Sequence, residues 1–322
     1  MNDDARWMGA ALALAARGHG RTAPNPNVGC VLVRGGVPVG RGWTQPGGRP
    51  HAEAVAIAMA GADARGATAY VTLEPCAHDS PRGPACADLL IDAGVARVVV
   101  ALQDPDPRTD GRGIARLRSA GIDVATGARA EQAESAMAGF LTRRTRERPF
   151  VTLKLALSLD GGLAMADGRS KWITGDAARA HAHLERARHD LILVGRGTLD
   201  ADAPALDVRI DGLEDRAPRR VLLSATATAP DGWLHIGAPA DIAALPGDHL
   251  MVEGGGATAA AFLAADLVDR LLVYRAPIVI GDARGIPAIG LADLADAHGR
   301  WRLVDTRALG SDRLEVYERR RG

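Results

Sequence analysis

Short apolar segments alternate with segments of helical composition along almost the whole chain. The apolar segments are bounded by glycine, proline or polar residues, which is typical of buried β-strands. The predicted strands are residues 30–33, 37–40, 68–73, 97–102, 122–125, 150–157, 191–194, 221–224, 249–252, 271–274 and 314–317. Their alternation with helices predicts an α/β fold in both halves of the chain.

The segments between these strands carry helix start and stop signals. Asn2 or Asp3 can cap a first helix that runs to about Arg17, and Gly61 and Gly94 end two further helices. The other predicted helices are residues 51–60, 86–93, 113–120, 131–146, 176–188 and 257–265, and one more that begins at Pro75-Cys76.

A basic stretch at residues 143–148 separates the two halves, and Pro149 after it prevents a helix from continuing. A stretch of this kind is more often a solvated helix end than an anion-binding site. At 322 residues the chain is also longer than one ordinary domain. We therefore predict two domains, residues 1–146 and residues 147–322.

Composition and charge narrow the possible classes of function. The chain has 39 Lys plus Arg and 39 Asp plus Glu, so its formal net charge is zero. Non-specific binding to nucleic acid or to a membrane surface needs a basic excess, so both are disfavoured. The three cysteines do not form a disulfide framework, no apolar run approaches membrane-spanning length, and the amino terminus lacks the features of a signal peptide. We expect a cytoplasmic protein.

One histidine and two cysteines predict a zinc site. Catalytic zinc takes three protein ligands and leaves one position for water, whose pKa falls to about 7. His51, Cys76 and Cys86 supply three ligands, whereas Cys30 falls inside an apolar strand and is expected in the core. Glu53 follows His51 by two positions, a spacing that leaves it free to act as the general acid and base.

The order of these residues is that of zinc-dependent nucleobase deaminases. Cytidine and tRNA deaminases close the site with Cys-x-x-Cys, whereas Cys76 and Cys86 are ten positions apart. Cys76 follows Pro75 at a predicted helix start, where the helix dipole favours a thiolate. The alternative is that these are unrelated core residues, which their ordered combination argues against.

The deaminase-like motifs resemble one family closely. Residues 24–30 (Pro-Asn-Pro-Asn-Val-Gly-Cys), 51–53 (His-Ala-Glu) and 74–78 (Glu-Pro-Cys-Ala-His), followed by Cys86, are similar to the bifunctional riboflavin-biosynthesis deaminase/reductase family. The resemblance implies a cytidine-deaminase-like three-layer first domain. Its substrate would be a diamino-pyrimidinone that carries a phosphoribosylamino group. The substrate contacts that the resemblance implies are Asn25, His78, Arg82 and Asp104.

Glycines after strands of the second half favour a nucleotide site, because glycine lets the backbone approach a phosphate. Neither Gly195-x-Gly197 nor residues 254–256 form a complete dinucleotide fingerprint. However, residues 154–161, 170–174, 197–206 and 252–255 resemble the reductase half of the same family. This resemblance implies a dihydrofolate-reductase-like α/β domain that uses NADPH to reduce the ribosyl side chain to ribityl.

The resemblance also implies two sets of contacts in the second half. The expected NADPH contacts are Ala156, Trp172, Thr198, Asp202, Ser224, Gly255, Gly256, Ala257, Thr258, Ala259, Ala260 and Ala261. The expected contacts to the reductase substrate are Ser170, Arg186, Leu206, Arg209 and Glu253. The two arginines suit a substrate phosphate because a guanidinium group can bind it bidentately.

One departure leaves alternatives open. Between Ser224 and Glu253 the chain is shorter than the family pattern, through loss either of a peripheral segment or of part of the NADPH site. A deaminase without reductase activity and a zinc-dependent binding protein therefore remain alternatives, whereas a tRNA or single-stranded DNA deaminase is disfavoured by the net charge and the cysteine spacing.

The expected partners are small phosphoribosylamino-pyrimidine substrates and further copies of the chain in a dimer or tetramer, without nucleic acid or membrane.

Overall fold

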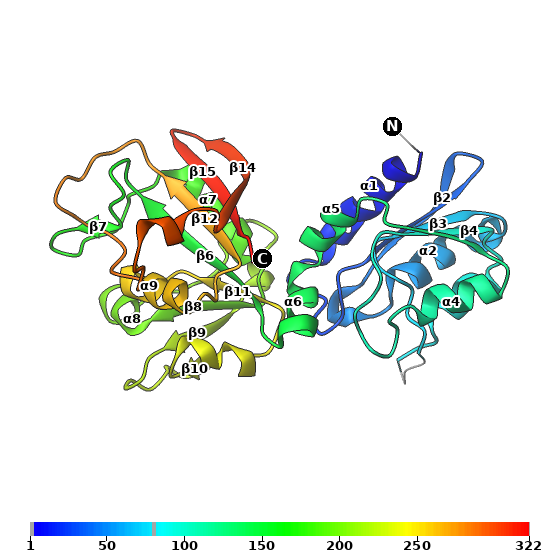
Figure 1. Ribbon diagram of the computed structural model, residues 1–322, viewed down its shortest axis with the longest axis horizontal. Coiled ribbons are helices and arrows are strands. Elements are labelled where there is room, and N and C mark those ends of the chain that lie inside the picture. The colour runs from blue at the N-terminus through cyan, green and yellow to red at the C-terminus, as the bar shows by residue number, and fades with distance from the viewer. Residues whose placement is uncertain (1–2, 79–81, 322) are drawn as a thin grey trace. The chain divides into compact units, whose positions relative to one another are not determined.

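The chain forms two compact units, Met1–Glu147 and Arg148–Gly322, in a computed structural model that describes residues 3–78 and 82–321. Each unit is a mixed α/β structure (Figure 1), so the predicted fold class is confirmed. Asn2, one of the two predicted caps of the first helix, and residues 79–81, before the helix predicted at residues 86–93, lie outside the described residues. Within the described parts, no helix is both long enough and apolar enough to cross a membrane.

The first unit is built around a five-stranded sheet with the strand order β2-β1-β3-β4-β5. The strand β1 pairs antiparallel with both β2 and β3, whereas β3, β4 and β5 run parallel. Its helices and strands are α1 (Asp3–Ala15), β1 (Gly29–Arg34), β2 (Val37–Trp43), α2 (Ala52–Ala60), β3 (Thr68–Val71), α3 (Cys86–Asp92), β4 (Arg97–Val100), α4 (Arg112–Ser119), β5 (Asp123–Thr126), α5 (Ala130–Ala136) and α6 (Ala138–Arg146).

Two helices of the first unit lie directly on opposite faces of this sheet. A Cβ atom added at Gly29 would come within 1.9 Å of a carbonyl oxygen of α1, and one added at Gly42 within 2.1 Å of a carbonyl oxygen of α2. Gly42 pairs with Cys30, the neighbour of Gly29, so the two glycines face opposite sides of the sheet. Gly40 approaches α2 at 2.2 Å in the same way. Close contact between the two backbones therefore fixes the distance between α2 and β2.

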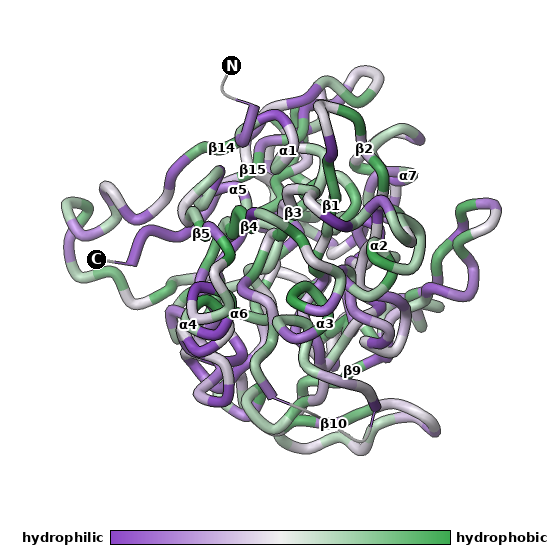
Figure 2. Tube along the Cα trace, turned by 90° about the vertical axis from the view of Figure 1, so that its right-hand side faces the viewer, coloured by the Kyte–Doolittle hydropathy of each residue, from purple (hydrophilic) through white to green (hydrophobic). Residues whose placement is uncertain are grey.

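The apolar residues of the strands form the core of the first unit. Cys30, Leu32, Val71 and Val98 are fully buried there, together with the apolar residues of the helices that cover the sheet. In Figure 2 the hydrophobic colours follow the strands, while hydrophilic residues gather on the outer loops. Burial of Cys30 in β1 agrees with its predicted place in the core.

Three details of the predicted helices are wrong. Met137 leaves the helical region, with φ −113° and ψ 18°, so the helix predicted at residues 131–146 is divided into α5 and α6. No helix begins at Pro75-Cys76, because proline permits a first helical turn without creating one. The Cys76 carbonyl instead accepts a hydrogen bond from the Ala87 N–H at 3.2 Å. His51 is the residue before α2, with extended backbone angles, and is not part of the helix.

The second unit contains an eight-stranded sheet with the order β10-β9-β8-β11-β6-β12-β15-β14. The pairs from β10 to β12 are parallel, and β15 and β14 add an antiparallel hairpin. Its helices and strands are β6 (Phe150–Leu157), β7 (Ala164–Met165), α7 (Asp176–Arg186), β8 (Leu191–Gly195), α8 (Arg196–Asp202), β9 (Arg219–Leu223), β10 (Leu234–Ile236), β11 (His249–Val252), α9 (Gly256–Ala264), β12 (Arg270–Arg275), β13 (Ala283–Arg284), β14 (Trp301–Leu309) and β15 (Asp312–Arg319).

A buried carboxylate joins three segments of the second unit. Asp269, just before β12, accepts hydrogen bonds from both terminal nitrogens of Arg148 at 2.6 and 2.8 Å and from the Val151 N–H at 2.9 Å. Arg321, after β15, contacts the same carboxylate. Asp269 thereby connects the start of β6, the start of β12 and the end of the chain.

Candidate functional site

Three side chains of the first unit come together as a candidate metal centre. The ligand atoms of His51, Cys76 and Cys86 all lie within 4.8 Å of one another. His51 Nδ1 is 3.3 Å from the Cys86 sulfur and 3.6 Å from the Cys76 sulfur. Tetrahedral zinc with ordinary bond lengths places a nitrogen and a sulfur ligand about 3.6 Å apart. The residues present therefore fit zinc.

Each of these side chains is held by a different segment. His51 precedes α2, Cys86 is the first residue of α3, and Cys76 lies in the irregular segment after β3. The backbone N–H of Cys86 donates a hydrogen bond to the Cys76 sulfur at 3.3 Å. The first turn of α3 therefore stabilises negative charge on Cys76. The helix that was predicted to begin at Cys76, and to do this instead, is not present in the described part of the chain.

The two cysteines shift each other's pKa in opposite directions. A hydrogen bond from the Cys86 thiol, with help from His51, lowers the pKa of Cys76 to about 4, and the same hydrogen bond to Cys76 raises the pKa of Cys86. A bound cation favours deprotonation of both thiols. Cys30 is fully buried in β1, where burial raises its pKa, and it is not part of this group.

Glu53 lies in the first turn of α2, beside the candidate metal centre. Its side chain is 3% exposed, and burial raises its pKa to about 6. Glu53 is not among the grouped ligand atoms, although it lines the same cavity as His51 and Cys76. A carboxyl group with a pKa near neutrality can accept and return a proton, as a general acid and base must.

A cavity of about 210 Å³ opens from this centre. The four substrate residues predicted for the first domain, Asn25, His78, Arg82 and Asp104, all line it. Asn25 Nδ2 lies 3.0 Å from His51 Nε2, and Arg82 donates a hydrogen bond to a backbone carbonyl at 2.6 Å. Burial raises the pKa of Asp104 to about 6. The structure therefore brings these residues together with Glu53 and the candidate zinc ligands.

Sequence reasoning missed several residues of this cavity. Glu74 accepts hydrogen bonds from the backbone N–H groups of residues 104, 111 and 114 at 3.2, 2.9 and 3.0 Å. These bonds hold the loop after β4 against the segment that contains Cys76. Its place directly before Pro75-Cys76 is a signal that could have indicated this role. Arg49, Arg108 and Arg144 also line the cavity, and Arg144 belongs to the basic stretch at residues 143–148 that was expected to be a solvated helix end.

In the second unit, several predicted NADPH residues lie at the carboxyl ends of parallel strands. Thr198 Oγ1 in α8 accepts a hydrogen bond from the Gly255 N–H at 3.1 Å, which joins the starts of α8 and α9. Asp202, at the end of α8, pairs with Lys171 at 3.8 Å. Ser224 follows β9, and its Oγ accepts hydrogen bonds from two backbone N–H groups of its own turn at 3.3 and 2.9 Å. Ala156 lies in β6, and residues 256–261 form the first part of α9.

The predicted substrate residues of this unit are only partly brought together. Arg186 donates two hydrogen bonds to Glu253, at 2.6 and 3.0 Å, and Lys154 lies 4.0 Å from the same carboxylate. Burial alone would raise the pKa of Glu253, but the hydrogen bonds from Arg186 and the nearby positive charges of Lys154 and Arg186 together outweigh it, and the pKa is lowered. Leu206 packs into a cluster with Ile192 and Val194. Ser170 and Arg209 are exposed, and Arg209 is linked to the ion pair through Asp207, whose carboxylate lies 3.4 Å from Arg209 and 3.9 Å from Arg186.

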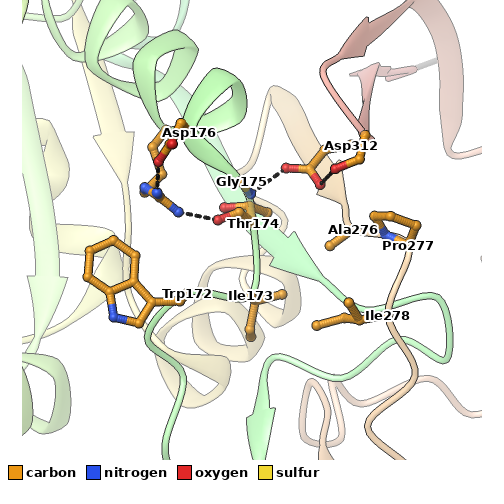
Figure 3. Close-up of a pocket in the computed structure, with 11 residues that line it drawn as sticks. Trp172, Ile173, Thr174, Gly175, Asp176, Ala276, Pro277, Ile278 and Asp312 are labelled. Atoms are coloured by element: carbon orange, nitrogen blue, oxygen red, sulfur yellow. Dashed lines mark hydrogen bonds and ion pairs between the residues drawn. The ribbon is translucent and has the colours of Figure 1, made fainter.

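A second cavity, of about 430 Å³, lies in the second unit beside the start of α7 (Figure 3). The Gly175 N–H donates a hydrogen bond to Asp312 at 2.7 Å across one wall, and Arg179 stacks on the Trp172 ring at 4.5 Å. Trp172 is 74% exposed and is the one predicted NADPH residue in the lining of this cavity. The cavity therefore adjoins the predicted cofactor surface without coinciding with it.

Two families match successive parts of the chain. Residues 1–102 match the family described as "Cytidine and deoxycytidylate deaminase zinc-binding region", and residues 149–235 and 240–314 match "RibD C-terminal domain". The interruption at residues 236–239 falls inside the shortened segment between Ser224 and Glu253. The first match covers His51, Cys76 and Cys86, and the second covers Arg186 and Glu253.

Relatives match over nearly the whole chain. The "Riboflavin biosynthesis protein RibD" of Haemophilus influenzae is 40% identical and covers 97% of this chain and 96% of the relative, and that of Escherichia coli is 41% identical and covers 96% and 97%. Among solved structures, Acinetobacter baumannii RibD matches with a TM-score of 0.89 at 35% identity, covering 99% of both chains. A Thermotoga maritima "diaminohydroxyphosphoribosylaminopyrimidine deaminase/ 5-amino-6-(5-phosphoribosylamino)uracil reductase" has a TM-score of 0.89 at 32% identity, covering 98% of both.

Proposed function

The chain belongs to the RibD family of riboflavin-biosynthesis proteins, and from this premise we propose how its two units divide the work. The protein is a bifunctional enzyme, a deaminase and a reductase, that uses zinc and NADPH. In our proposal residues 1–146 deaminate 2,5-diamino-6-(5-phosphoribosylamino)pyrimidin-4-one. Residues 147–322 then reduce the ribosyl side chain of the product to ribityl. The single observation that supports this division best is the group of His51, Cys76 and Cys86 beside a buried Glu53 in the first unit.

The deamination replaces an amino group of the ring with oxygen and releases ammonia. Zinc held by His51, Cys76 and Cys86 supplies, when bound, an activated water for this hydrolysis. Glu53 takes a proton from that water and returns it to the departing amino group, a role that its raised pKa of about 6 supports. Its burial excludes bulk water from the path of the proton.

The cavity residues of the first unit would orient the substrate. Asn25 is close enough to His51 to hold the imidazole ring, and its amide can also pair with the edge of the pyrimidine. His78, Arg82 and Asp104 line the same space, where Asp104 is placed to contact the ribose and Arg82 to contact the phosphate. These contacts would bring the amino-bearing carbon to the zinc and to Glu53.

In the second unit NADPH supplies the hydride when bound, and the protein supplies binding and orientation. The start of α9, which the Gly255 N–H joins to Thr198 of α8, would face the cofactor phosphates with its positive helix end. The ion pair of Arg186 with Glu253 lies next to this region and would contact the substrate, and Ser170, Leu206 and Arg209 are proposed as further substrate contacts. A substrate phosphate that binds Arg186 must compete with Glu253 for its guanidinium group.

A product assay tests the whole proposal. The zinc-loaded full chain is incubated with the diamino substrate, with and without NADPH, and the products are identified by mass. We expect ammonia and 5-amino-6-(5-phosphoribosylamino)uracil without NADPH, and the ribityl product with oxidation of NADPH when it is present. Deamination without reduction would favour the alternative of an impaired second unit, and the absence of both would contradict the proposal.

Zinc binding can be tested separately from catalysis. Cys76→Ala removes one of three ligands and is expected to reduce bound zinc from about one ion per chain to a small fraction of that, as measured by elemental analysis after dialysis. Cys30→Ala is the matched control, because Cys30 is buried but lies outside the ligand group. Equal zinc content in the two variants would contradict the assigned ligand set.

We also propose that the enzyme acts in the cytoplasm as a homo-oligomer, a dimer or a tetramer. The strand β14 supports self-association, because it forms an edge of the large sheet and exposes the apolar side chains of Leu303 and Val304. Its partners otherwise are the small phosphoribosylamino-pyrimidine substrates.

A further inference from the structure

Two arginines share one buried carboxylate in the wall of the deaminase cavity. Arg108 donates hydrogen bonds to both oxygens of Asp106, at 2.9 and 2.6 Å, and Arg144 lies 3.4 Å from the same carboxylate. The Asp106 side chain is 6% exposed, whereas those of Arg108 and Arg144 are 60% and 35% exposed. Arg144 also lies over the ring of the buried Phe140, at 5.3 Å from its centroid. The carboxylate thus holds two solvent-accessible guanidinium groups at the cavity.

The arginines and the candidate zinc ligands belong to one cavity but differ in exposure. Glu53 and Cys76 are buried, which places the proposed chemistry at the closed end of the cavity. Arg108 and Arg144 line the same cavity with side chains that solvent reaches, which places them towards its open end. A substrate with its ring at the metal would therefore extend its substituent towards these arginines.

The charges of this cluster do not cancel. The two guanidinium groups and the one carboxylate together carry one net positive charge. Asp104, a further buried acid of the cavity, accepts a hydrogen bond from the Asp106 N–H at 2.9 Å, and burial raises its pKa to about 6. The neighbouring arginines hold the pKa of Asp106 far below its ordinary value, so it remains an anion and cannot neutralise both of them. Glu74, another acid of the cavity, is occupied with backbone N–H groups of the loop after β4. A phosphate monoester, with a charge of about −1.5 to −2 at neutral pH, complements this excess.

We propose that Arg108 and Arg144, together with Arg82, bind the phosphate of the deaminase substrate and so make the enzyme prefer the phosphorylated over the dephosphorylated pyrimidine. Guanidinium groups suit this task because their planar donors match phosphate oxygens and always carry charge. Phe140 supports the guanidinium plane of Arg144, and Asp106 fixes that of Arg108. The proposal rests on the deaminase function proposed above and adds two residues, one on the loop after β4 and one on α6, that the family resemblance does not assign to the substrate.

The test compares two substrates in the zinc-loaded full chain without NADPH. The first is the diamino-pyrimidinone with a phosphoribosylamino group, and the second is the same compound after removal of the phosphate. We expect the ratio of their kcat/KM values to fall about tenfold in Arg108→Gln and again in Arg144→Gln, mainly through a higher KM for the phosphorylated substrate. Arg144→Lys, which keeps the charge, is expected to retain more of the preference than Arg144→Gln. A parallel measurement follows how far ribose 5-phosphate raises the melting temperature of the wild type and of each variant.

The control is Arg116→Gln, because Arg116 also pairs with an aspartate, Asp88, at the surface of the first unit, but neither residue lines the cavity. The control should keep the wild-type ratio, and zinc analysis shows that each variant retains its metal. An unchanged ratio in both glutamine variants, with a wild type that prefers the phosphorylated substrate, would overturn the proposal. A wild type that deaminates neither compound would instead overturn the proposed function, and this inference with it.

Discussion

Glu53→Gln is expected to slow deamination by about 10²–10⁴-fold while the zinc content stays at one ion per chain. Glutamine keeps the size and planar shape of the side chain, and it can still form hydrogen bonds, but it cannot accept a proton. Glu53 is buried beside the metal group without belonging to it, so its loss should leave the three ligands in place. Ammonia release under zinc-replete conditions measures the rate, and elemental analysis measures the metal.

The reductase activity serves as the internal control for this variant. When the deaminated intermediate is supplied directly, Glu53→Gln should oxidise NADPH at the wild-type rate, because Glu53 belongs to the first unit. Near-normal release of ammonia would remove Glu53 from the proposed mechanism. Loss of both activities together with loss of zinc would show that the side chain mainly supports the fold.

Asp269→Ala is expected to lower the free energy of unfolding of the second unit by about 3–5 kcal/mol. The substitution leaves Arg148, whose side chain is 10% exposed, without its bidentate partner, and it also removes the acceptor for the Val151 N–H. A buried cation without a counter-charge is more costly than the loss of the contact itself. Hydrogen–deuterium exchange of β6 and β12 under native conditions reports the stability of this unit separately from that of the first.

Asp305→Ala is the matched control for this variant. Asp305 also pairs with an arginine, Arg307 at 2.6 Å, but the side chains are 35% and 54% exposed. A surface pair of this kind is expected to change stability by no more than about 1 kcal/mol. If both variants changed the exchange rates of β6 and β12 to the same small extent, Asp269 would not stabilise the second unit in the way that its contacts indicate.

The sequence located the group of His51, Cys76 and Cys86 because a zinc site of this kind depends on few residue types in a fixed order. His51, Cys76 and Cys86 could be selected since Cys30 lies in a run of apolar residues, and burial of Cys30 in β1 agrees with that selection. The strands of both sheets could also be located, because buried strands are continuous apolar segments. Residues 150–157 and 249–252 form β6 and β11 with the predicted bounds.

Other features depend on contacts that local sequence does not encode. The strand β14 was not predicted because it is an edge strand, exposed along most of its length, and so lacks the alternation of a half-buried strand. The shared carboxylate of Arg108 and Arg144 joins a loop to α6, and either arginine read alone is an ordinary solvated residue. In the same way, Arg186 suggested a phosphate ligand, whereas the structure shows it paired with Glu253, a partner far away in the chain.

The glycines of β2 limit how this enzyme can change its specificity. Gly40 and Gly42 bring α2 so close to the strand that any larger residue there would collide with main-chain atoms of the helix, which no change of rotamer can relieve. His51 and Glu53, at the start of α2, therefore keep a fixed height above the sheet. Adaptation to a larger or smaller substrate must come instead from other segments that line the cavity, such as the loop after β4 and α6, which can vary without moving the proposed catalytic carboxylate.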